Sequence, residues 1–96
     1  MYMVVSRWEI APGREEEFEQ KGKVVRGILR SQPGVVRVEG VRDGRDVYAI
    51  HCYESEQDYN RIVQDPNGPF AKAVEEHNLD GIGTWIHSVR GPGITD

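Results

Sequence analysis

The chain has 96 residues, of which 38% are hydrophobic and 29% are charged, and 16 acidic residues against 12 basic ones give a formal net charge of -4. This length predicts one domain, and the composition is typical of a globular protein and excludes a disordered chain. The acidic balance argues against a nucleic-acid partner, because contacts with phosphates require a concentrated basic face.

The first part of the chain predicts a strand followed by a helix. β-branched and aromatic residues favour a strand from Tyr2 to Ile10, and Ala11-Pro12-Gly13 ends it because proline lacks the donor that a sheet requires. From Arg14 to Ser31 the apolar residues recur with helical spacing. The residues on this stripe are Phe18, Gly22, Val25 and Leu29.

The middle of the chain predicts a hairpin. The apolar runs from Val35 to Val41 and from Val47 to Tyr53 flank the pair Asp43-Gly44. An Asp-Gly pair between apolar runs is a strong signal for a tight turn, so we expect two antiparallel neighbouring strands.

The last part predicts a second helical region and a final strand. Ser55 with Asp58 resembles a capping box, and the helix that starts there is interrupted over residues 65–69. Its apolar stripe then resumes at Phe70, Val74 and His77. A strand from Ile82 to Val89 completes one domain over residues 1–90, and residues 91–96 are expected to form an extended C-terminal arm.

Elements in the order β-α-β-β-α-β with right-handed crossovers predict a ferredoxin-like α+β fold. Its four-stranded antiparallel sheet has the strand order 4-1-3-2 and carries the helices on one face. Strict alternation puts Trp85 and His87 on one face of the last strand and Ile86 and Ser88 on the other, so both faces carry large apolar groups. An uncovered apolar face exceeds what soluble monomers expose, so we expect a homodimer formed through this sheet face.

Three further features limit the surroundings in which the chain works. No stretch has the pattern of a membrane-spanning helix or of a secretory leader, so neither a membrane nor export is expected. Cys52 is the only cysteine, which excludes an internal disulfide and fits a cytoplasmic protein. The three histidines have no short ligand spacing, so no metal site is expected.

Several segments follow one another in a recognisable order and spacing. They are Ala11-Pro12-Gly13-Arg14-Glu15-Glu16-Glu17-Phe18, then Gln32-Pro33-Gly34, then Tyr53-Glu54-Ser55. This ordered set, which covers nearly the whole chain, resembles the antibiotic biosynthesis monooxygenase (ABM) domain family. The resemblance implies a dimeric α/β barrel, in which two ferredoxin-like sheets close face to face.

The resemblance also implies an activity, a monooxygenase without a cofactor that acts on a small aromatic phenol or quinol with a histidine as base. An electron-rich phenolate can give an electron to dioxygen by itself, while the protein binds, desolvates and deprotonates it. Two alternatives stay open: a non-catalytic dimeric module for a small aromatic or hydrophobic ligand, and a haem-binding or haem-degrading protein. The haem-degrading branch has asparagine, tryptophan and histidine where this chain has Ser6, Ile62 and His77, so two of these positions differ.

The candidate catalytic residues are His77, His51 and His87, and the candidate substrate-binding residues are Ser6, Trp8, Tyr48, Tyr59, Ile62, Phe70 and Trp85. His77 is the first choice because it ends the apolar stripe beside the expected cleft between helices and sheet. Each histidine also has a structural interpretation, as a helix C-terminal residue or as part of the dimer interface. The aromatic residues have one too, as members of the core.

Overall fold

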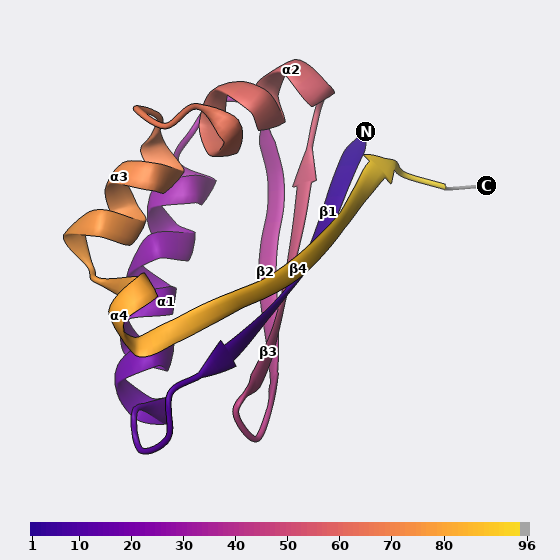
Figure 1. Ribbon diagram of the computed structural model, residues 1–96. Helices are drawn as coiled ribbons and strands as arrows, with labels where there is room; N and C mark the ends of the chain where they lie inside the picture. Colours follow the sequence, from indigo (N-terminus) through magenta and orange to yellow (C-terminus); the bar gives the residue numbers. More distant parts are fainter. Residues whose placement is uncertain (95–96) are drawn as a thin grey trace.

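Four antiparallel strands form one sheet in the computed structural model, which describes residues 1–94 (Figure 1). The strands are β1 (Tyr2–Ile10), β2 (Val35–Asp43), β3 (Asp46–Tyr53) and β4 (Gly83–Pro92). Their order across the sheet is β2-β3-β1-β4, with β1 paired antiparallel to both β3 and β4. The predicted ferredoxin-like fold and strand order are confirmed.

The helices lie on one side of this sheet, with α1 and α3 next to each other (Figure 1). They are α1 (Glu15–Arg30), α2 (Glu56–Tyr59), the π-helical turn η1 (Asn60–Gln64), α3 (Pro69–Glu76) and α4 (Leu79–Ile82). Helix α1 buries the predicted stripe of Phe18, Gly22, Val25 and Leu29. The core therefore lies between one face of the sheet and this helical layer.

The second helical region starts as predicted and then departs from the prediction. The Ser55 side chain accepts a hydrogen bond from the Asp58 backbone nitrogen at 3.2 Å and so begins α2. The helix then continues as the π-helical turn η1, which was not predicted from the sequence. Such turns are frequent at functional sites. Pro69 occupies the first turn of α3, where its missing donor costs nothing.

The predicted limits of the last strand are wrong at both ends. Ile82 closes the helical turn α4, because it and Leu79 are both buried in the core and one helical turn brings them to the same side. At the other end, Gly91 and Pro92, expected in the arm, pair with β1 as part of β4. The end of the expected arm, residues 95–96, lies outside the described residues.

A β-bulge changes which residues of β4 share a face. Arg7 pairs with His87 and Trp8 pairs with Trp85, which leaves Ile86 as an extra residue. Directly paired residues project from the same face, so Trp85 faces the helices with Trp8, and His87 faces the opposite side with Arg7. The expectation that Trp85 and His87 share a face is therefore wrong.

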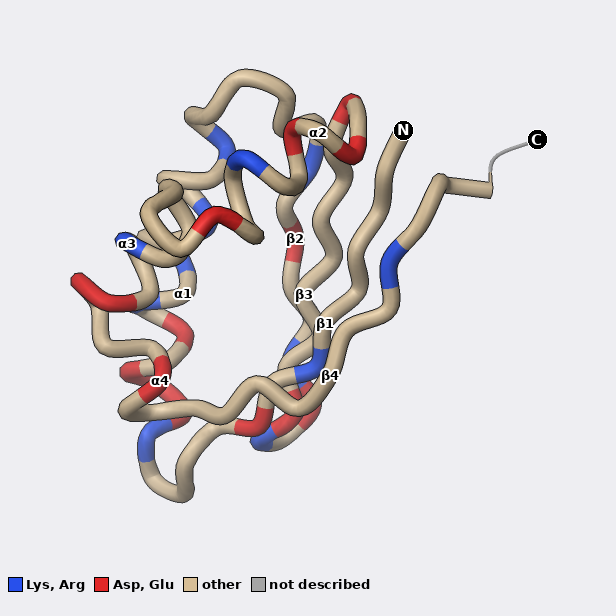
Figure 2. The backbone as a smooth tube through the Cα atoms, turned by 45° about the horizontal axis from the view of Figure 1, so that its top comes forward, with Lys and Arg blue, Asp and Glu red and all other residues tan. Residues whose placement is uncertain are grey.

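The sheet face turned away from the helices, here called the open face, carries large apolar residues together with some charged ones. By register its apolar residues include Val5, Val41, Tyr48, Ile50 and Val89, and Arg7 and Glu39 lie on the same face. Charged residues gather on the helices and at the β2–β3 turn, whereas residues 47–53 of β3 carry no charge (Figure 2). None of the helices within residues 1–94 is long and apolar enough to cross a membrane.

Candidate functional site

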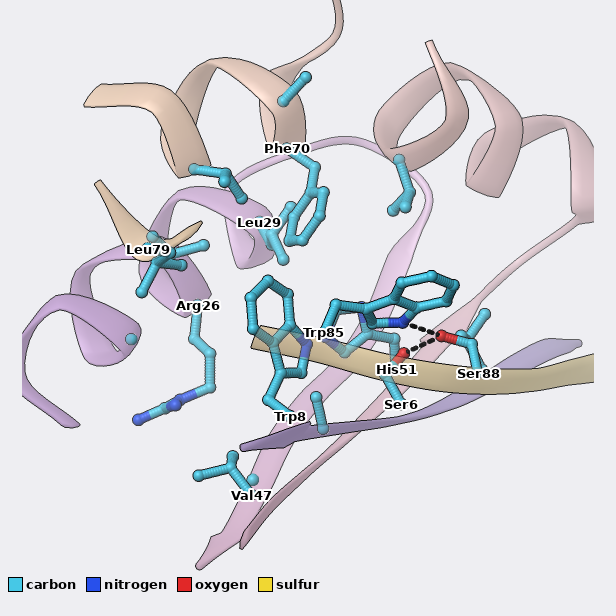
Figure 3. A pocket seen from close by; sticks show the side chains of 18 of the residues that line it. Ser6, Trp8, Arg26, Leu29, Val47, His51, Phe70, Leu79, Trp85 and Ser88 are labelled. Atoms are coloured by element: carbon cyan, nitrogen blue, oxygen red, sulfur yellow. Dashed lines mark hydrogen bonds between the residues drawn. The ribbon is translucent and has the colours of Figure 1, made fainter. Parts of the chain in front are cut away.

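A cavity of ≈ 830 Å³ lies between the helix-bearing face of the sheet and the helical layer (Figure 3). Its floor is formed by inward-facing residues of β1, β3 and β4, and its roof by residues of α1, η1 and α3. This volume is in the range of sites for small organic ligands, which is about 300–1,000 Å³.

Several aromatic side chains lie in the cavity wall. Trp8 projects from β1, and its ring centroid lies 6.0 Å from that of Phe18 in a tilted arrangement. A side chain at Gly83 would collide with the Phe18 ring, so a glycine is required where β4 passes beneath it. Phe70 from α3 and Trp85 from β4 face the same space (Figure 3). Such a wall favours a planar, largely apolar ligand.

His51 projects from β3 into this cavity, and its Nδ1 atom lies 2.9 Å from the hydroxyl oxygen of Tyr53. Burial, with a smaller contribution from the positive charge of Arg26, lowers the pKa of His51 to about 4. The imidazole is therefore uncharged at neutral pH. Burial also raises the pKa of Tyr53, so the Tyr53 hydroxyl keeps its proton.

A short polar chain crosses the floor between β1 and β4. The indole Nε1–H of Trp85 donates to Ser88 Oγ at 2.9 Å, and Ser88 Oγ lies 2.6 Å from Ser6 Oγ (Figure 3). Ser6 and Ser88 are directly paired across the two strands. These hydrogen bonds form because the bulge turns Trp85 to the face that Ser88 occupies. Ser6 and Ser88 give the apolar floor two hydroxyl groups.

Two arginines border the cavity and differ in their partners. Arg90 donates from Nη1 to the Tyr59 hydroxyl at 3.2 Å, and Gln64 donates to the same oxygen at 2.6 Å. Arg26, from α1, has neither an ion pair nor a side-chain hydrogen bond with another residue in the described part of the chain. Partial burial lowers the pKa of Arg26, but a guanidinium stays charged at neutral pH. The wall thus offers a positive charge to an anionic group of a ligand.

Most of the residues predicted from sequence to form the site lie in the wall of this cavity. They are Ser6, Trp8, His51, Tyr59, Phe70 and Trp85. The others lie elsewhere. Tyr48 and His87 are on the open face, and Ile62 is fully buried in the core. His77 follows the last turn of α3, whose wall residues are Phe70, Ala71, Val74 and Glu75. The first choice for a histidine in the cleft is therefore His51 and not His77.

The sequence analysis missed several polar residues of the wall, among them Arg26, Gln64, Ser88 and Arg90. Arg26 had a detectable signal, because it lies one helical turn after Gly22 and beside Val25 on the apolar stripe. Ser88 and Arg90 had none, since the bulge that turns them inward depends on how β4 pairs with β1.

His77, which stands where the haem-degrading branch has a histidine, lies outside the cavity wall, and Ile62 packs in the core instead of facing the cavity. Among residues 1–94, no group of three or more His, Cys, Asp or Glu side chains is arranged to hold a metal ion.

Fold and cavity together define a ferredoxin-like α+β protein with a cavity between sheet and helices. Residues 1–76 match the sequence profile of the family described as antibiotic biosynthesis monooxygenase. The match spans most of the chain, and the chain belongs to this family, as the resemblance of its motifs indicated. A search of curated protein sequences finds no match.

Solved structures of low sequence identity share the fold. SnoaB from Streptomyces nogalater, a cofactor-independent oxygenase, superposes with a TM-score of 0.81 at 18% identity, over 99% of this chain and 94% of SnoaB. A structure described as antibiotic biosynthesis monooxygenase gives a TM-score of 0.76 at 13% identity, over 99% of this chain and 100% of the other. A variant of MhuD with two manganese protoporphyrin IX molecules bound per active site gives 0.75 at 16% identity, over 100% of this chain and 97% of MhuD.

Proposed function

We propose that this protein is a cofactor-independent monooxygenase that oxidises a small aromatic phenol or quinol in the cavity. The observation that carries this proposal is a cavity of ≈ 830 Å³ that has both tryptophans, Trp8 and Trp85, and an uncharged histidine, His51, in its wall. Membership of the family and the likeness to SnoaB support the reaction class.

The proposed reaction takes all its electrons from the substrate. The phenolate passes one electron to dioxygen, and the phenoxyl radical and superoxide then combine in a C–O bond at a ring carbon that carries hydrogen and lies ortho or para to the phenolate oxygen. The O–O bond breaks as that carbon loses its proton, so that a phenol and dioxygen become a quinone and water. The protein has to bind the ring, exclude water and stabilise the phenolate.

The residues of the wall have the chemistry for these tasks. Trp8, Phe70 and Trp85 present aromatic faces against which a planar ring can pack. His51 contacts the ionisable oxygen of the substrate, and the charge of Arg26 favours the phenolate over the neutral phenol. The apolar residues of the roof, among them Leu29, Val63 and Val74, keep water away from the radical pair.

We also propose that two copies of the chain pair through the open face. Val41, Tyr48 and Val89 are 57%, 41% and 59% exposed there, although they are large apolar side chains. Soluble proteins cover apolar surfaces of this kind, and a second copy presents the same surface to be covered.

The test of the activity is dioxygen consumption with a panel of phenols and hydroquinones. The wild type is expected to consume dioxygen and to form a quinone with at least one of them. His51→Ala is expected to lower the rate about 100-fold, because it removes a polar group at the reacting oxygen.

His77→Ala is the matched control, since it removes a histidine that lies outside the cavity wall, and its rate should equal that of the wild type. If the wild type binds phenols but consumes no dioxygen with any of them, the protein is a ligand-binding module and the oxygenase proposal is wrong.

A further inference from the structure

His51 has two ring nitrogens in different surroundings. Nδ1 lies 2.9 Å from the Tyr53 hydroxyl, whereas Nε2 has no hydrogen-bond partner among the residues that the structure describes. Since His51 lines the cavity, Nε2 is the atom left for a ligand. We propose that Tyr53 holds His51 in the tautomer that carries its proton on Nε2, so that the cavity offers a ligand oxygen a hydrogen-bond donor and not a base.

The proton of the Tyr53 hydroxyl determines which nitrogen of His51 is protonated. The Tyr53 side chain is fully buried, at 0% exposure, and within residues 1–94 its hydroxyl has one hydrogen-bond partner, Nδ1 of His51. If Nδ1 carried the imidazole proton, it would donate to the tyrosine oxygen, and the phenolic proton would be buried without an acceptor. Buried donors without acceptors are rare because they lose their hydrogen bond to water. Nδ1 is therefore the acceptor, and the proton of the neutral ring is on Nε2.

The surroundings of Tyr53 hold its hydroxyl in this position. Its ring meets that of Tyr59 edge-on, with centroids 5.6 Å apart, and that of His51 with centroids 6.0 Å apart. Tyr59 is itself held by the hydrogen bonds from Gln64 and Arg90. Tyr53 does not line the cavity, so it is a positioning residue that acts on the ligand through His51.

The tautomer has a consequence for the ligand, and this part rests on the proposed function. A donor at Nε2, with the positive charge of Arg26 also in the wall, suits a phenolate or quinol monoanion that enters already ionised. It does not suit a neutral phenol that must first lose its proton to the protein. The cavity therefore selects phenols that are acidic enough to ionise near neutral pH.

The tautomer is tested by nitrogen NMR of isotope-labelled histidine, with the His51 signal assigned from His51→Gln. In the wild type at neutral pH, we expect the protonated nitrogen of His51 to be Nε2. Tyr53→Phe removes the hydroxyl and should produce a mixture of the two tautomers. Tyr48→Phe, the same change on the open face, should leave the spectrum unaltered.

Protonation at Nδ1 in the wild type would overturn the proposal, and so would an unchanged His51 signal in Tyr53→Phe. If Tyr53→Phe does not fold, the wild-type spectrum decides by itself. None of these results depends on dioxygen consumption, so failure of the proposed activity and failure of the tautomer are distinguishable.

The donor role is tested with para-nitrophenol, whose phenolate is yellow and which the cavity cannot readily oxidise. We expect the bound probe to be the phenolate while His51 stays neutral by nitrogen NMR. A His51 imidazolium in the complex would show that the histidine takes the proton, and would overturn the donor role. Binding of the neutral phenol would overturn the preference for an anion.

Discussion

The two faces of the sheet are built from the same strands, yet they have different surroundings. On the helix-bearing face, Trp8, Val47 and His51 lie under a helical layer and enclose a cavity. On the open face, Tyr48, which follows Val47 directly, is exposed. The comparison shows that alternation along a strand lets one segment line a cavity on one face of the sheet and present exposed apolar side chains on the other.

A single residue decides how β4 contributes to the two faces. Because Ile86 is an extra residue in the pairing with β1, Trp85 joins the cavity and His87 joins the open face. Without the bulge, Trp85 and His87 would project from the same face of the sheet.

The largest expected effect concerns the open face. Val89→Lys places a charge in the proposed dimer interface of each copy. The two buried and unpaired charges of the dimer together cost at least about 4 kcal/mol, so the dissociation constant should rise at least about 1,000-fold. Light scattering at micromolar concentration should then show a monomer for the variant and a dimer for the wild type.

Val24→Lys is the control for this change, because Val24 is 48% exposed on α1, on the other side of the molecule. It should stay dimeric. A monomeric wild type would contradict the idea that the open face is an interface.

The next effect concerns the helix-bearing face and its pH dependence. Native His51 has a pKa of about 4 against 6.5 for an exposed histidine, so the unfolded state binds more protons between these values. The free energy of unfolding should therefore fall as the pH is lowered from 6.5 to 4, by roughly 3 kcal/mol in total. Urea unfolding over this pH range should show a flatter curve for His51→Gln than for the wild type.

His87→Gln carries the same substitution on the open face and serves as the control. If both variants flatten the curve equally, the difference in burial between the two histidines is not what shapes the pH dependence.

The smallest expected effect is a difference in the free energy of unfolding between substitutions of two valines in one strand, β2. Val38 is 1% exposed beneath the helices, and Val41 is 57% exposed on the open face. Val38→Ala should lower the free energy of unfolding by about 2 kcal/mol, and Val41→Ala by less than about 0.5 kcal/mol, in dilute protein. Urea unfolding measures both values.

Protein concentration sharpens this last comparison. If the dimer covers Val41, the effect of Val41→Ala should grow as the concentration is raised, because association stabilises the folded chain. An equal loss in both variants in dilute protein would contradict the difference in burial.

Much of the fold was predictable from residues close together in the sequence. The strand from Tyr2 to Ile10, the stripe of α1 and the Asp-Gly turn depend on backbone preferences and on side-chain periodicity, which neighbours along the chain decide. Trp8, Tyr59 and Phe70 were likewise predicted as site residues and line the cavity, whereas Tyr48, predicted with them, lies on the open face.

What only the tertiary structure decided is which groups meet in the cavity. The cavity contains His51 instead of His77, and it also contains Trp85 and Ser88. His51 in turn contacts Tyr53. These placements depend on the register between strands and on how the broken helix packs over the sheet. A shift of one residue in register moves a side chain to the other face of the sheet, and no local pattern in this sequence records that shift. The sequence by itself determined the elements, their order and the two-faced sheet, whereas the contacts between distant strands determined the site.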